Sequence, residues 1–176
     1  MRIKFILASA LGALMLSESA FGLSCMRPDL VKSLEEAKDS PKIYHILVGR
    51  FKSVSREPAY PKMGPNMPPE DQFKPRPPRI MQSYFEGYSL AKTPHQDWPL
   101  SRFPVDIEVS CMGPWCSSVP SPDRQLIAFV EARPGLPPIL KISPCPGKTF
   151  EADRKQVQKI RQCLDKKCAS EEPNWR

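Results

Sequence analysis

Six cysteines constrain the fold of this chain more than any other sequence feature. They stand at Cys25, Cys111, Cys116, Cys145, Cys163 and Cys168, all after an N-terminal segment typical of a secretory signal. In an oxidising compartment six cysteines can form three disulfides, whereas in the cytosol they would indicate metal binding or redox chemistry. The cysteines therefore predict an exported domain that is stabilised by disulfides.

Residues 1–22 are predicted to form a signal peptide. Arg2 and Lys4 precede an apolar run over residues 5–16, which is shorter than the roughly 20 apolar residues that span a bilayer. Ala20 and Gly22 are small residues that fit a cut after Gly22. The mature protein is then one domain over residues 23–168 with a flexible tail over 169–176, and it is periplasmic or secreted.

A lipid anchor is the alternative to a freely diffusing mature chain. Cleavage after Ser24 would make Cys25 the first residue and the acceptor for a lipid, although Gly22 and Leu23 form a poor lipobox. Membrane contact is expected only in that case.

Hydrophobic periodicity predicts five strands flanked by two short helices. Pro28 is expected in the first turn of the first helix, which ends before Pro41. The second helix opens at a possible capping box formed by Asp153 and Gln156. Gly49 lies inside the first strand and indicates a bulge or a bend. The strands are expected at residues 43–54, 80–90, 103–111, 125–131 and 136–143.

Residues 56–79 are predicted to form a proline-rich loop inserted between the first two strands. Eight prolines in this stretch exclude regular ladder pairing, and the loop carries Lys74, Arg76 and Arg79 at its far end. A stiff connector is the simpler interpretation, and a ligand for an aromatic groove is the alternative.

The order of these parts resembles that of the netrin-like modules shared by the tissue inhibitors of metalloproteinases, in particular their small exported bacterial relatives of unassigned function. The resemblance covers Cys25 to Cys168 and depends on several short motifs. They are Ile46-Leu47-Val48-Gly49-Arg50, Phe85-Glu86-Gly87, Cys111 with Gly113-Pro114-Trp115-Cys116, the apolar run 127–130, and Ser143-Pro144-Cys145. The resemblance implies a mainly β fold, a five-stranded OB-type barrel with short N-terminal and C-terminal helices packed outside and disulfides tying the N-terminus to the barrel.

The same resemblance bears on Cys25. In the metalloproteinase inhibitors the free α-amine of the first mature cysteine chelates the zinc of the target, and a second cysteine follows two residues later. Here Arg27 occupies that second position, and a cut after Gly22 would leave Leu23 and Ser24 in front of Cys25. Cys25 is therefore expected to serve as a covalent staple, and protease inhibition is kept as an alternative function.

The cysteine pairing stays open at this point, because six cysteines allow 15 connectivities. We hypothesise the pairs Cys25–Cys145, Cys111–Cys116 and Cys163–Cys168. A Cys25–Cys111 link, found by mass mapping of a non-reduced digest, would contradict this pairing. The two short pairs lack the two-residue spacing of redox motifs, which argues against catalysis by thiols. A thiol-redox protein is kept as the second alternative function.

Other enzymatic chemistry finds little support. His45 and His95 are the only histidines, and their spacing suits no common metal site. The chain contains neither a serine in a nucleophile elbow nor a glycine-rich phosphate loop. We therefore expect a protein that is not an enzyme and needs no metal or cofactor.

A binding role agrees better with the sequence. Aromatic and arginine side chains dominate interface energetics. The candidate contacts are Trp98 and Trp115, which are expected in loops, and the basic residues Lys74, Arg76 and Arg79. A net charge of +7 favours anionic surfaces, but export and the few exposed strand aromatics argue against nucleic acid. The expected function is that of a monomeric binding or structural module that recognises an envelope or extracellular protein.

Overall fold

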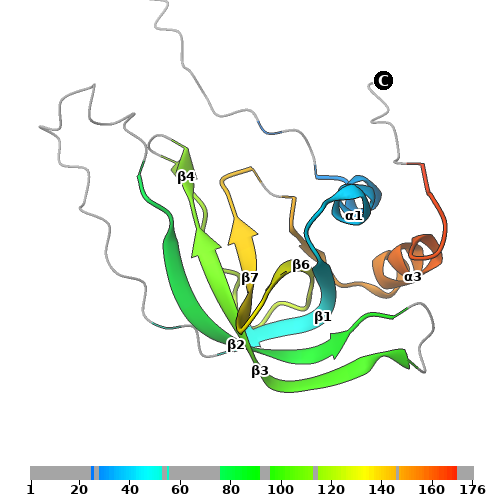
Figure 1. Cartoon of the computed structure of the whole chain (residues 1–176), viewed down its shortest axis with the longest axis horizontal. Helices are drawn as coiled ribbons and strands as arrows, with labels where there is room; N and C mark the ends of the chain where they lie inside the picture. Colours follow the sequence, from blue (N-terminus) through cyan, green and yellow to red (C-terminus); the bar gives the residue numbers. More distant parts are fainter. Residues whose placement is uncertain are drawn as a thin grey trace, which may run out of the picture.

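Five long strands close a barrel in the computed structural model of the chain (Figure 1). They are β1 (Tyr44–Lys52), β2 (Arg79–Ser89), β3 (Trp98–Val109), β6 (Leu126–Arg133) and β7 (Leu136–Ile142). The structure describes residues 25, 28–52, 55, 76–91, 96–112, 115–145 and 147–169. The expected signal peptide, Lys74, His95, most of the proline-rich loop and most of the tail lie outside the described residues.

The strand pairings follow the order β1-β2-β3-β7-β6, and β6 pairs back onto β1 to close the barrel. All of these pairings are antiparallel except that between β3 and β7, which is parallel. A closed five-stranded barrel with this order is consistent with an OB-type fold. The predicted fold class is confirmed.

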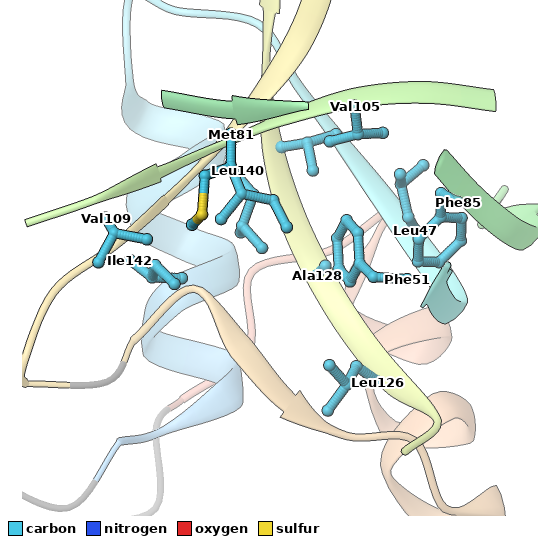
Figure 2. Packing of buried hydrophobic residues seen from close by; sticks show 12 residues of the cluster. Leu47, Phe51, Met81, Phe85, Val105, Val109, Leu126, Ala128, Leu140 and Ile142 are labelled. Carbon is cyan, nitrogen blue, oxygen red and sulfur yellow. The ribbon is translucent and has the colours of Figure 1, made fainter. Parts of the chain in front are cut away.

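The barrel interior is filled by alternate side chains of all five strands. Phe51 and Phe85 pack edge to face with ring centroids 5.0 Å apart, and both are fully buried. Figure 2 shows side chains of this cluster converging on the space between the strands. The burial of Val105, Ile107 and Val109 confirms the period-two pattern of a strand with one buried face, although the strand ends at Val109 and not at the predicted residue 111.

A second apolar cluster lies on the outer face of β1 and β6. It joins helix α1 (Leu30–Asp39) and helix α3 (Arg154–Cys163) to the barrel, and the two helices lie side by side (Figure 1). Ile46 and Val48 of β1 and Phe129 of β6 point into this cluster. Since β1 and β6 have core on both faces, each contains a continuous apolar run, residues 46–48 in β1 and 126–130 in β6.

Side-chain caps fix the start of each helix. The carboxylate of Asp29 accepts hydrogen bonds from the backbone N–H groups of Val31 and Lys32, and that of Asp153 accepts one from Gln156. Pro28 precedes the cap of α1, so the prediction that it lies in the first turn is wrong by two positions. Among the described residues, neither helix has the length and apolar character needed to cross a bilayer.

Of the two features predicted at Gly49, a bulge or a bend, the bulge is absent, whereas β1 is bent (Figure 1). Gly49 pairs directly with Gly87 across β1 and β2, with an unbroken register on both sides. A Cβ at Gly49 would overlap the carbonyl oxygen of Glu86, and one at Gly87 would overlap that of Val48. The two glycines are needed because the two backbones approach closely here. The bulge lies instead between β2 and β3, where Arg102 adopts a left-handed φ of 50°.

Three short strands were not predicted. β4 (Cys111–Met112) and β5 (Trp115–Cys116) form a small hairpin, and β8 (Thr149–Glu151) pairs with the first half of β6. Segments of two or three residues are too short to show a hydrophobic period. β3 also begins at Trp98, five residues earlier than expected, because residues 98–102 are mostly exposed and show no alternation.

The structure contains the three hypothesised disulfides. Cys25–Cys145 joins residues 120 apart in the sequence, whereas Cys111–Cys116 and Cys163–Cys168 each join residues five apart. All six cysteines are thereby paired. Three disulfides are consistent with an oxidising environment outside the cytosol.

An ion pair fastens the end of the β2–β3 hairpin to α3. The Nη2 atom of Arg161 lies 2.7 Å from Oδ2 of Asp97, and its Nη1 atom donates to Oδ1 of Asp97 and to the carbonyl oxygen of Ala91. Hydrogen bonding from Arg161, partly opposed by burial, lowers the pKa of Asp97 below its ordinary value. Both side chains are mostly buried, so solvent screens the pair only in part.

The variant Asp97→Asn is expected to lose about 2 kcal/mol of the free energy of unfolding near neutral pH, because a charge-assisted pair is broken. Since the folded-state pKa of Asp97 is lowered, its contribution is present above the unfolded-state pKa and disappears as pH falls through the folded-state value. Urea unfolding at about pH 7 and about pH 3 should therefore show a gap between wild type and variant that narrows in acid. An equal gap at both pH values would contradict this assignment.

Candidate functional site

A groove of about 810 Å³ opens at one mouth of the barrel. Leu126, the first residue of β6, and Ile142, the last residue of β7, belong to the interior core and also line the groove. Figure 2 shows Ile142 beside Val109, its partner at the end of β3. We call this space, with the residues that line it in segments 25, 115–126 and 141–149, the barrel-mouth groove.

One wall of the barrel-mouth groove is covalently fixed. The segment that follows β7 carries Ser143, Pro144 and Cys145, and the disulfide to Cys25 holds it in place. All four of these residues line the groove. The N-terminal end of the domain is therefore attached directly to the site.

A second part of the lining comes from β5 of the β4–β5 hairpin and from the segment after it. The carbonyl oxygen of Ile142 accepts hydrogen bonds from the backbone N–H of Ser110 at 3.0 Å, from its hydroxyl at 3.1 Å and from the hydroxyl of Ser117 at 3.0 Å. These contacts hold the hairpin beside the end of β7, as Figure 1 shows. They place Trp115, which is 40% exposed, at the rim of the groove.

The charge of the barrel-mouth groove is positive. Arg124, Lys141 and Lys148 line it, and none of the described residues that line it is Asp or Glu. The Nζ atom of Lys148 lies 5.2 Å from the centre of the Tyr44 ring, a cation–π distance. A ligand in the groove would therefore meet serine hydroxyls, an aromatic edge and cationic groups.

A smaller cavity of about 240 Å³ adjoins the groove and shares Lys141 and Lys148 with it. It contains Glu131, whose two carboxylate oxygens each lie 3.0 Å from a lysine Nζ, one from Lys42 and one from Lys141. Burial raises the pKa of Glu131, but the hydrogen bonds and charges of Lys141 and Lys42 together lower it by more. The pKa of Glu131 is therefore below its ordinary value. Glu131 thus stays ionised and keeps Lys141 in position.

The structure separates the contact residues proposed from the sequence. Trp115 lines the groove, whereas Trp98 begins β3, pairs with Ser89 and is 71% exposed. Both tryptophans belong to strands, so their expected placement in loops is wrong. Arg76 and Arg79 are not among the groove residues, and the Nη atoms of Arg79 are closed off from solvent.

Sequence reasoning did not find Arg124, Lys141 and Lys148 as site residues. Each is an ordinary surface cation in the sequence, with no motif around it. The strand order and the Cys25–Cys145 disulfide bring the three together. Two sequence predictions pointed to this end of the barrel: the pairing of Cys25 with Cys145, and Trp115 as a contact residue.

Metal binding and known relatives offer no further guide. Within the part of the chain that the structure describes, no group of three or more His, Cys, Asp or Glu side chains is placed to hold a metal ion. Comparisons of the chain with protein-family models, with curated proteins and with solved structures found no match.

Proposed function

We propose that this chain is an exported, non-enzymatic binding module that holds a segment of an envelope or extracellular protein in the barrel-mouth groove. The observation that carries the proposal is the groove itself, an open space of about 810 Å³ with Trp115 at its rim and three cationic side chains in its lining. Volumes of about 300–1,000 Å³ are typical of sites that enclose a small ligand. A short segment of a partner fits this size better than a whole domain surface does.

The walls of the groove favour binding without large rearrangement. The Cys25–Cys145 disulfide fixes one wall, and the three hydrogen bonds to the Ile142 carbonyl oxygen fix the part of the lining at the β4–β5 hairpin. A preformed site spends less free energy on ordering its own side chains when the ligand arrives. Trp115 supplies the kind of aromatic anchor on which interface affinity often depends.

Photo-crosslinking in cells that export the chain tests this proposal. A photoreactive amino acid is placed at Ser118, which is exposed and lines the groove, and separately at Leu136, which is 61% exposed at the other end of β7. We expect a discrete cross-linked product from position 118 and none from position 136, because only the first faces the bound segment. Products from position 136 alone, or from neither position, would contradict the proposal.

Protease inhibition is a second candidate, and one observation supports it. Cys25 lines the barrel-mouth groove, so a mature chain beginning at Cys25 would present its α-amine at the edge of the site. N-terminal sequencing of the exported protein distinguishes the two functions. A mature start at Leu23 would leave Cys25 without a free α-amine and would exclude zinc chelation by that group.

A further inference from the structure

β7 separates from its neighbour β6 before β7 ends. β6 pairs with β7 at Arg133 with Leu136 and at Glu131 with Ile139, and no further along. β7 continues to Ile142 while its other edge stays paired with β3. Beyond Ile139, the β6-facing edge of β7 borders the smaller cavity, which Phe129 and Glu131 of β6 also line. From Lys141 to Ser143 it borders the barrel-mouth groove as well.

Strand geometry indicates which backbone groups face the groove. The carbonyl oxygen of Ile142 accepts from the N–H of Ser110, so the backbone groups of Ile142 point toward β3. Backbone groups of successive residues in a strand point to opposite edges, so those of Lys141 and Ser143 point the other way. Both residues line the groove. An extended peptide lying there would find backbone hydrogen-bond partners at every second residue.

The charges of the groove select the side chains of such a peptide. Lys141 is held by Glu131, whereas Lys148 and Arg124 add positive charge to a lining whose described residues include no carboxylate. Arg124 also lines a neighbouring cavity together with three acidic residues, Asp123, Glu151 and Asp153, whereas Lys148 does not line that cavity. Opposite charge on a ligand increases both its rate of association and its selectivity. Acidic side chains are the complement of this lining.

We propose that the barrel-mouth groove receives an extended acidic segment of the partner protein, which adds as a strand along the free edge of β7 near Lys141 and Ser143. This inference rests on the proposed function and specifies its ligand. Strand addition supplies affinity through the main chain, and side-chain sites then supply specificity. Lys148, Arg124 and Trp115 provide those side-chain sites.

Synthetic peptides test the inference directly. Capped, fluorescent peptides of about eight residues alternate valine with glutamate, with glutamine or with lysine, and a fourth carries the glutamate sequence with alternate backbone nitrogens methylated. Binding to the full mature protein is followed by fluorescence anisotropy at low and at high salt. We expect the glutamate peptide to bind roughly tenfold more tightly than the glutamine and N-methylated peptides, and more weakly at high salt.

Matched charge reversals locate the site. Arg124→Glu combined with Lys148→Glu should weaken binding of the glutamate peptide by roughly tenfold or more. Arg154→Glu combined with Lys155→Glu, at exposed positions on α3, makes the same change of net charge away from the groove and should leave the affinity unchanged. Circular dichroism confirms that each variant is folded.

The peptide and cross-linking experiments test the acidic ligand and the binding module separately. Equal affinity for the glutamate and glutamine peptides, or undiminished binding of the N-methylated peptide, would overturn the inference, as would failure of all four peptides to bind. The photo-crosslinking experiment stays independent: a cross-link from position 118 with no preference for acidic peptides would keep the binding module and discard this ligand. Loss of both results would discard the proposed function as well.

Discussion

Replacing Cys25 and Cys145 together by alanine is expected to lower the free energy of unfolding by about 4–5 kcal/mol, the largest loss that any of the three disulfides can give. The pair joins residues 120 apart, so its removal releases the unfolded chain from its longest closed loop. Guanidinium unfolding under non-reducing conditions, with the other two disulfides intact, measures the loss. The variant should also lose affinity for any ligand of the barrel-mouth groove, because Cys25 and Cys145 form part of its wall.

The matched control is the double replacement of Cys111 and Cys116. This disulfide joins residues only five apart, and the same entropic argument gives a loss of about 2 kcal/mol. The comparison holds the number of removed bonds constant and changes only the length of the loop. Equal losses in the two variants would contradict a stabilisation that acts through the unfolded chain.

Replacing either Gly49 or Gly87 by alanine is expected to cost about 3–5 kcal/mol, because a steric overlap and a backbone strain are added together. The new Cβ would overlap a carbonyl oxygen of the facing strand, which cannot move without breaking the β1–β2 ladder. Both residues also have φ values that side chains rarely adopt, 157° for Gly49 and 150° for Gly87. Thermal and urea unfolding measure the effect.

Two other glycines distinguish the steric overlap from the backbone strain. Gly135 has a left-handed φ of 70° and open space around its Cβ position, so Gly135→Ala should cost only about 1 kcal/mol. Gly147 also has open space and no unusual φ, so Gly147→Ala should be close to neutral. The expected ranking puts Gly49 and Gly87 first, Gly135 second and Gly147 last. A loss at Gly147 as large as that at Gly49 would contradict the steric explanation.

The barrel could be predicted from the sequence because each long strand has its own signature. The alternation of residues 103–111 gives one buried face, and the continuous apolar run of β6 reflects core on both faces. The helices that cover β1 and β6 were predicted from their apolar stripes, and only the second from its cap, because the cap of α1 at Asp29 was not identified. The local pattern therefore contains most of the information about the fold.

The barrel-mouth groove could not be predicted in the same way. Its lining comes from three separate segments, at residue 25, at 115–126 and at 141–149. They meet because β7 leaves β6 at Ile139, because Ser110 and Ser117 bind the Ile142 carbonyl oxygen, and because Cys25 is bonded to Cys145. None of these long-range events has a periodic signal. Trp115 was identified from its residue type alone, and the same reasoning chose Trp98, which lies elsewhere.

The short Cys111–Cys116 disulfide has a consequence for the order in which the chain oxidises. On the proposed export route, with the N-terminus first, Cys25 would meet the thiols at positions 111 and 116 before Cys145 arrives. Contacts between residues close in sequence form faster than contacts across a long loop. The β4–β5 hairpin, which aligns Cys111 opposite Cys116, therefore removes both competing thiols early and leaves Cys25 for its distant partner. A bond that adds little to equilibrium stability in this way directs the formation of the bond that adds most.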